Sequence, residues 1–177
     1  MSAPLISPDY LAQQQKMHAD YKTYGSSSLK YAPWVAERIR HWKPDGVLDY
    51  GAGKGNLAKA LAETPSLPPF KLTPYEPAAP EWSATPQPHT MVVSIDVLEH
   101  IEPDLLENVL ADIRRVTQQV ALVTIHTGPA KKILPDGRNA HLIQQPAEWW
   151  LPKLQHYFSP QEMAVEEKGF RVELLPR

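Results

Sequence analysis

The sequence contains no cysteine among its 177 residues. This absence excludes disulfide bonds, zinc sites built on thiolates and cysteine nucleophiles. No apolar run approaches the length that spans a bilayer, and Met1-Ser2-Ala3-Pro4 is not typical of a signal peptide. We therefore expect a cytoplasmic protein with no membrane partner.

An excess of charge of either sign is also missing. With 18 basic and 20 acidic residues the formal net charge is −2, so the sequence shows no basic footprint for nucleic acid or anionic membranes. Proline, in contrast, is abundant, with 19 residues. Several fall between Pro65 and Pro88, where we expect stiff, non-helical connections. The length predicts one domain over residues 1–177.

A glycine-rich stretch, Asp49-Tyr50-Gly51-Ala52-Gly53-Lys54-Gly55, is the most informative part of the chain. It follows a short apolar run and precedes a helix-like segment, Asn56 to Glu63. Glycines at alternate positions allow a tight turn and a close approach of the backbone to a ligand. The spacing fits neither the dinucleotide fingerprint nor the phosphate loop. The alternative is a plain strand-to-helix turn without a ligand.

Apolar runs and helical segments alternate along the chain. The predicted strands are Val47 to Tyr50, Phe70 to Tyr75, Met91 to Ile95 and Val120 to Ile125, and a hairpin is predicted over Met163 to Leu174. This alternation indicates an α/β sandwich with a mostly parallel sheet and an antiparallel C-terminal hairpin. Ligands of such sheets bind beyond the carboxyl ends of the strands. Polar residues at those ends, from Asp49 to His126, are therefore expected to converge.

Three segments together resemble the Rossmann-like, S-adenosylmethionine-dependent methyltransferases. They are the D-x-G-x-G-x-G loop at Asp49–Gly55, the acid Glu76 after the second strand, and Ser94-Ile95-Asp96-Val97-Leu98-Glu99-His100-Ile101 after the fourth strand of the family. The resemblance covers about Leu48 to Ile125. It implies a single three-layer Rossmann-like domain, S-adenosylmethionine as cofactor and methyl transfer as activity. The short, proline-rich interval after Glu76 departs from the family and predicts a shortened third-strand region.

The resemblance also implies which residues hold the cofactor: Asp49, Tyr50, Gly51, Ala52, Gly53, Gly55, Glu76, Asp96 and Val97. The carboxylate of Glu76 is expected to accept the ribose hydroxyl hydrogens; the alternative is a solvated surface glutamate. Residues 1–43 are expected to be helical and to cover the cofactor site, with Tyr21, Tyr24, Gly25 and Ser26 near it. Residues 44–177 form the expected α/β core.

Three histidines, His100, His126 and His141, are the candidate general bases, because histidine exchanges a proton near neutral pH. For His100 the alternative is a residue at a helix entry that binds backbone. Arg138 is expected to pair with an acidic group of the substrate and Asn139 to hydrogen-bond it. The alternative is a local network that pins this loop to the domain. No metal is expected.

The expected acceptor is a small molecule, or a small group, with an oxygen or nitrogen nucleophile. The strand that ends at Ser94-Ile95-Asp96-Val97 lacks the N/D/S-P-P-aromatic motif of DNA amino-methylating enzymes, and C5-pyrimidine methylation needs a cysteine. Nucleic acid is therefore not the expected partner. Two alternatives stay open: an S-adenosylmethionine-binding regulatory or partner protein without transfer activity, and a dinucleotide dehydrogenase, which the loop spacing disfavours. The sequence leaves the oligomeric state undetermined.

Overall fold

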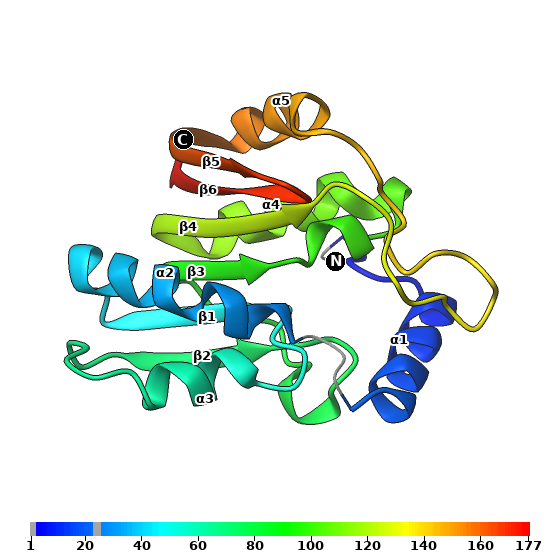
Figure 1. The fold of residues 1–177 in the computed structure, drawn as a ribbon, viewed down its shortest axis with the longest axis horizontal. Coiled ribbons are helices and arrows are strands. Elements are labelled where there is room, and N and C mark those ends of the chain that lie inside the picture. The colour runs from blue at the N-terminus through cyan, green and yellow to red at the C-terminus, as the bar shows by residue number, and fades with distance from the viewer. Residues whose placement is uncertain (1–2, 23–25) are drawn as a thin grey trace.

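Six strands form one mixed sheet in the computed structural model, which describes residues 3–22 and 26–177. The strand order is β2-β1-β3-β4-β6-β5 (Figure 1). Strands β1 to β4 are parallel, β6 runs antiparallel to β4, and β5 runs antiparallel to β6. The Rossmann-like α/β class and the C-terminal antiparallel hairpin are thereby confirmed. The strands are β1 (Gly46–Tyr50), β2 (Lys71–Tyr75), β3 (His89–Ile95), β4 (Thr117–His126), β5 (Phe158–Glu166) and β6 (Gly169–Pro176).

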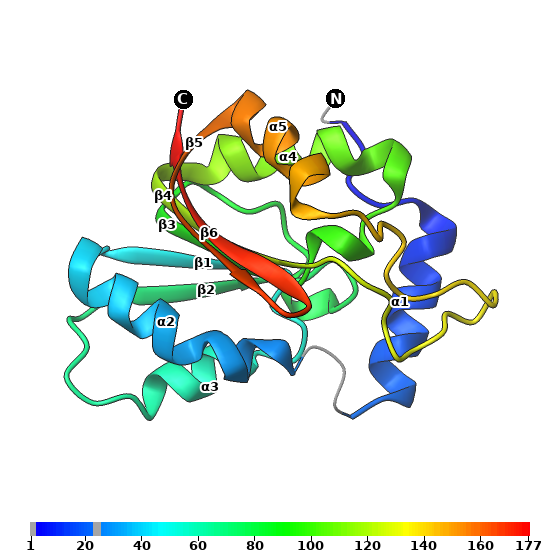
Figure 2. The same ribbon diagram turned by 45° about the horizontal axis from the view of Figure 1, so that its top comes forward.

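Four of the described helices cover the two faces of the sheet and make the three layers: α2 (Ser27–Trp42), α3 (Asn56–Ala62), α4 (Leu106–Val116) and α5 (Ala147–Tyr157). Helix α1 (Pro8–Asp20) lies outside these layers (Figure 1). Figure 2 shows α2 and α3 on one face and α4 and α5 on the other. In α2, Tyr31, Val35 and Ile39 follow one another at helical spacing and are buried. The central strands β1, β3 and β4 are buried over most of their length, as expected of parallel strands covered on both faces. None of the helices described is long and apolar enough to cross a bilayer.

The connection between β2 and β3 holds only a short 3-10 helix, Pro80–Trp82, in a stretch that is described throughout. Its backbone is tied to the end of β2, because the N–H of Glu76 donates to the carbonyl of Trp82 over 3.1 Å. The expected shortening of the third-strand region is thus confirmed. As a result β2 is one edge of the sheet, and β5 is the other.

Two element boundaries differ from the sequence expectation. The hairpin begins at Phe158 and not at Met163, because its first residues pair with β6 on the far side of a register shift near Pro160. Glu102-Pro103-Asp104 is typical of the start of an α-helix, but a 3-10 turn, Pro103–Leu105, comes first and α4 begins at Leu106. Neither difference moves the strand ends that carry polar residues.

Helix α1 lies beyond the carboxyl ends of the parallel strands, beside the β4–α5 loop (residues 127–146) (Figure 1). Ser7 caps this helix by accepting a hydrogen bond from the N–H of Tyr10 over 3.2 Å. Tyr10 and Met17 of α1 pack against Leu134 and Ala140 of the loop in a small apolar cluster of their own. Helix and loop therefore form a roof over the strand ends.

Candidate active site

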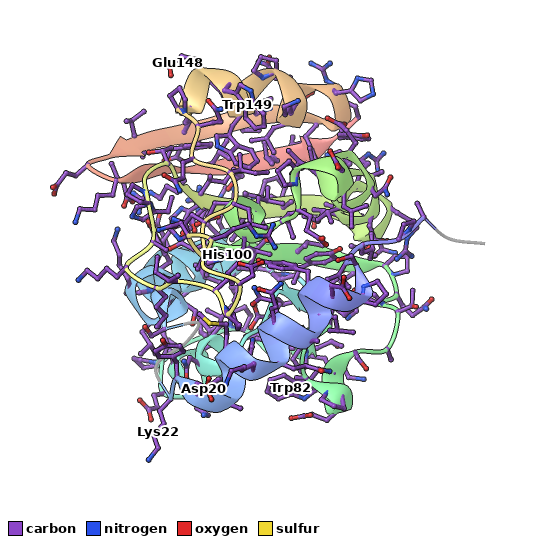
Figure 3. All side chains as sticks on the ribbon, turned by 90° about the vertical axis from the view of Figure 1, so that its right-hand side faces the viewer. Asp20, Lys22, Trp82, His100, Glu148 and Trp149 are labelled. Carbon is purple, nitrogen blue, oxygen red and sulfur yellow. The ribbon has the colours of Figure 1, made fainter. Side chains whose placement is uncertain are left out.

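A cavity of about 880 Å³ lies under this roof, at the carboxyl ends of β1 to β4. Small-molecule sites commonly have volumes of about 300–1,000 Å³. Figure 3 views the molecule from this end and labels His100 near the middle of the face, between α1 and the β4–α5 loop. The predicted site residues that line the cavity are Asp49, Tyr50, Gly51, Ala52, Gly53, Glu76, Asp96, Val97, His100, His126 and His141.

The glycine loop presents bare backbone to the cavity. Gly51 and Gly53 have φ of 85° and 56°, in the left-handed region that favours glycine. A Cβ at Gly51 would press on both methyl groups of Val97, one of them at 2.9 Å. The amides of Gly51 and Ala52 donate to the carbonyl of Tyr75 over 2.8 and 3.0 Å. The loop is therefore held in a shape that leaves room where a side chain would stand.

Gly55 has a different structural role from Gly51 and Gly53. Its φ is 68° at the start of α3, and a Cβ there would meet the ring of Trp82 at 2.9 Å. Trp82 comes from the 3-10 helix after β2 and is labelled in Figure 3. Gly55 is not among the residues that line the cavity. In this structure it permits the packing of Trp82.

Two carboxylates face the cavity beside the glycine loop. Asp49 is 3% exposed, and its Oδ2 has no hydrogen-bond partner in the described part of the chain. Burial raises its pKa to about 7, and the negative charge of Glu76 adds to the rise. Glu76 accepts hydrogen bonds from the amides of Gly53 and Ala78, each over 3.1 Å. Burial raises the pKa of Glu76 as well, against the effect of these amides.

Asp96 follows the last residue of β3 and also lines the cavity. Its φ of 50° is left-handed, and its amide donates to the carbonyl and the hydroxyl of Thr124 over 3.1 and 3.0 Å. The Thr124 hydroxyl donates in turn to the carboxylate of Asp96 over 2.6 Å. The next residue, Val97, covers Gly51. Tyr50 directs its hydroxyl away, to Asp112 of α4, over 2.9 Å.

The three histidines come together in another part of the cavity wall, built by the end of β4, the turn after β3 and the β4–α5 loop. The ring centres of His100 and His141 are 4.7 Å apart, and those of His126 and His141 are 4.8 Å apart. Burial lowers the pKa of His100 to about 3, and the neighbouring His141 contributes. Burial also lowers the pKa of His141. Both rings are therefore neutral at neutral pH.

Glu99 is a buried acid that the sequence interpretation quoted but gave no role. It is 0% exposed, and its Oε1 accepts a hydrogen bond from the amide of His126 over 3.0 Å. Its Oε2 has no hydrogen-bond partner in the described ranges. Burial raises the pKa of Glu99 well above its ordinary value. The sequence did contain a signal for this acid: Glu99 follows two apolar residues, Val97 and Leu98, at the start of a turn.

Arg138 and Asn139 make their contacts within the β4–α5 loop. The guanidinium of Arg138 donates to the carboxylate of Asp136 over 2.8 Å, and neither Arg138 nor Asn139 lines the cavity. The amide oxygen of Asn139 accepts from the N–H groups of Ala130 and His141, each over 2.9 Å. Its amide nitrogen donates to the carbonyl of Ala130 over 2.9 Å. Asn139 thus fixes the loop that carries His141.

Several contacts that sequence reasoning missed attach α1 to the site. The hydroxyl of Tyr10 donates to the carbonyl of His100 over 2.6 Å. The N–H and hydroxyl of Ser7 donate to the carboxylate of Glu102 over 2.8 and 2.7 Å. Of the residues expected near the cofactor, Ser26 lines the cavity and Tyr21 is 39% exposed. Tyr24 and Gly25 lie outside the described residues.

Solved structures share this architecture over almost the whole chain. The structure of Burkholderia thailandensis 1,6-didemethyltoxoflavin-N1-methyltransferase with bound 1,6-didemethyltoxoflavin and S-adenosylhomocysteine has a TM-score of 0.69 at 17% identity, over 99% of this chain and 93% of that one. The mitomycin 7-O-methyltransferase MmcR has a TM-score of 0.67 at 15% identity, over 94% and 60% of the two chains.

The N-methyltransferase NodS of Bradyrhizobium japonicum, in complex with S-adenosylhomocysteine, has a TM-score of 0.61 at 10% identity, over 95% and 97% of the chains. At these identities the likeness concerns the fold. No curated protein matches the sequence. Residues 27–175 match the family described as "Methyltransferase domain". The chain therefore belongs to the methyltransferase-domain family and has the Rossmann-like fold of the S-adenosylmethionine-dependent methyltransferases.

Proposed function

We propose that this protein transfers the methyl group of S-adenosylmethionine to an oxygen or nitrogen atom of a small-molecule acceptor. The observation that carries the proposal is the continuity of the cavity. One space of about 880 Å³ reaches from the glycine loop and Glu76 to the three histidines. A cofactor and a small acceptor can thus lie side by side in one enclosure, with the reacting atoms between the two sets of residues.

The first side of the cavity suits the cofactor. The bare backbone at Gly51 and Gly53 leaves room for a ligand, and the unpaired Oδ2 of Asp49 is an acceptor for the ammonium at the amino-acid end. Glu76 uses one lone pair of each oxygen for backbone amides, and a carboxylate has about four such sites. Two therefore remain for the ribose hydroxyls. The bound cofactor supplies an activated methyl group on a sulfonium.

The second side suits the acceptor. His100, His126 and His141 line it from three different elements, and the roof of α1 and the β4–α5 loop limits the size of what enters. Two of the similar structures support a small acceptor, since one holds 1,6-didemethyltoxoflavin and the other is a mitomycin O-methyltransferase. We place His126 against the acceptor's O–H or N–H, where it takes the proton that methyl transfer releases.

For the chain itself the main tasks are positioning and the exclusion of water. In this proposal the roof limits the access of bulk solvent to the reacting atoms, and both sets of residues are held at or next to the strand ends of one sheet. Arg138 has no part in this proposal, because it pairs with Asp136 outside the cavity. Asn139 contributes by holding the backbone of His141.

Transfer of a labelled methyl group tests the proposal directly. The protein is incubated with S-adenosylmethionine labelled in the methyl group and with panels of phenols, amines and nitrogen heterocycles, and label in the acceptor fraction is measured. We expect label in at least one acceptor class and one S-adenosylhomocysteine per methyl transferred. If the protein binds S-adenosylhomocysteine yet transfers no label to any panel, a binding protein without transfer activity is the better description.

A further inference from the structure

The histidine side of the cavity also contains the elements of a metal site. One ligand atom each of Glu99, His100 and His141 lies within 4.8 Å of the others. Around a Zn²⁺ ion with bonds of about 2.0–2.2 Å, ligand atoms lie roughly 3–4 Å apart. Movements of about 1 Å would thus close the three side chains around an ion. Two of the three, His100 and His141, line the cavity.

Backbone carbonyls fix the orientation of both histidine rings. The Nδ1 of His100 lies 2.7 Å from the carbonyl oxygen of Ala140, and the Nδ1 of His141 lies 2.7 Å from that of Gly128. A carbonyl oxygen only accepts hydrogen bonds, so both Nδ1 atoms carry a proton. The lone pair of each neutral ring is therefore on Nε2. Histidines that bind metals are held in this way, with the second nitrogen donating to a carbonyl or carboxylate.

The carboxylate of Glu99 is the third candidate ligand, and one of its oxygens makes no hydrogen bond within the described residues. Glu99 is fully buried, and its Oε2 is without a hydrogen-bond partner in the part of the chain that is described. The salt bridges found between described residues do not include Glu99. Asp96 brings a second negative charge close to it. A divalent cation would supply the missing positive charge and the missing partner at once.

We propose that Glu99, His100 and His141 bind one divalent cation of the Zn²⁺ type. Two imidazoles and one carboxylate suit zinc and its first-row neighbours, whereas Mg²⁺ and Ca²⁺ prefer oxygen ligands alone. Three protein ligands leave at least one coordination position open. Because both histidines line the cavity, that position faces the side that suits the acceptor. The sequence analysis expected no metal, and its argument from the absence of cysteine excludes only sites built on thiolates.

The competing explanation is that Glu99 is simply a protonated acid. Glu99→Gln separates the two, because glutamine has the shape of the protonated acid and retains an oxygen for the amide of His126. A protonated Glu99 predicts that this variant behaves like the wild type. A metal ligand predicts that it loses the ion and keeps the fold.

The test is titration of the metal-free protein with Co²⁺, followed by Zn²⁺, with calorimetry and visible absorption as readouts. We expect one Co²⁺ per chain with visible d–d bands, and displacement by one Zn²⁺. Glu99→Gln and His141→Gln should each bind Zn²⁺ at least roughly 100-fold more weakly, since even outer partners of a metal site contribute 10–100-fold. His156→Gln, which removes an exposed histidine of α5, should match the wild type.

Binding of S-adenosylhomocysteine is measured on each variant in parallel, so that loss of the fold or of the cofactor site is distinguished from loss of the metal. Variants that bind S-adenosylhomocysteine normally but lose Zn²⁺ support the metal site whether or not methyl transfer is found. Equal Zn²⁺ affinity of the wild type and Glu99→Gln, or absence of d–d bands in the wild type, would overturn it.

Discussion

The two sides of the cavity are built in different ways. On the glycine-loop side, consecutive residues and backbone conformation set the shape. Gly51 and Gly53 have positive φ, and the amides of Gly51 and Ala52 are bonded to the end of β2. On the histidine side, the groups come from β4, the turn after β3 and the β4–α5 loop, and distant backbone carbonyls orient the rings. The shape of the glycine-loop side therefore requires residues without a Cβ. The histidine side instead requires long-range hydrogen bonds that orient its side chains.

The largest effect is expected from filling the glycine-loop side. Gly51→Val should remove measurable binding of S-adenosylhomocysteine in calorimetry, because the new side chain meets Val97 and the cavity. Gly137→Val is the matched control. Gly137 also has positive φ, at 90°, but a Cβ there has nothing within 4 Å. Both variants should lose about 1–2 kcal/mol of stability from the left-handed backbone, Gly51→Val should lose more because of its contact with Val97, and only Gly51→Val should lose the ligand. Normal binding by Gly51→Val would remove the loop from the site.

On the histidine side, a substitution should reduce turnover without weakening the binding of S-adenosylhomocysteine. His126→Gln should lower kcat by roughly 10²–10⁴-fold, the usual contribution of a positioned proton acceptor, and leave the affinity for S-adenosylhomocysteine nearly unchanged. Single-turnover transfer of labelled methyl measures the first quantity, and calorimetry measures the second. His156→Gln controls for removal of any histidine. An unchanged kcat in His126→Gln would mean that the site works by positioning alone.

Glu76 is expected to have an intermediate effect confined to the cofactor. Glu76→Ala removes a charge-assisted hydrogen bond worth about 1.5–3 kcal/mol, which corresponds to roughly a 10–100-fold weaker affinity for S-adenosylmethionine. The exposed Glu81 lies on the following 3-10 helix, and Glu81→Ala should bind normally. If the two variants bind alike, the carboxylate of Glu76 does not contact the cofactor.

The last prediction concerns the protonation of Asp49 without cofactor. Its folded-state pKa of about 7 exceeds the ordinary value of 3.8, so between these values the folded chain holds a proton that the unfolded chain has lost. The free energy of unfolding should therefore fall as pH rises from 4 to 7, by roughly 1 kcal/mol per pH unit from this group. Urea unfolding at pH 5, 6 and 7 measures the slope. Asp49→Asn should reduce it, and equal slopes would refute the assignment.

The sequence predicted the sheet, because continuous apolar runs such as Met91 to Ile95 are local signals of buried strands. The glycine spacing is also local, and Gly51 and Gly53 of the predicted loop line the cavity, whereas Gly55 does not. The histidine side was less accessible, because its geometry depends on partners far apart in the chain. The hydrogen bond from His100 to Ala140 spans 40 residues. The role of Asn139 likewise depends on Ala130, which no local pattern indicates.

The two outer strands of the sheet have a consequence for how this protein meets other molecules. An edge strand offers a row of unpaired backbone donors and acceptors to which a strand of another molecule can be added. Here β2 contains Pro74 and β5 contains Pro160, and proline has no N–H to donate. A register shift near Pro160 further interrupts the pairing of β5. Both edges of the sheet are thus poor templates for intermolecular strand addition.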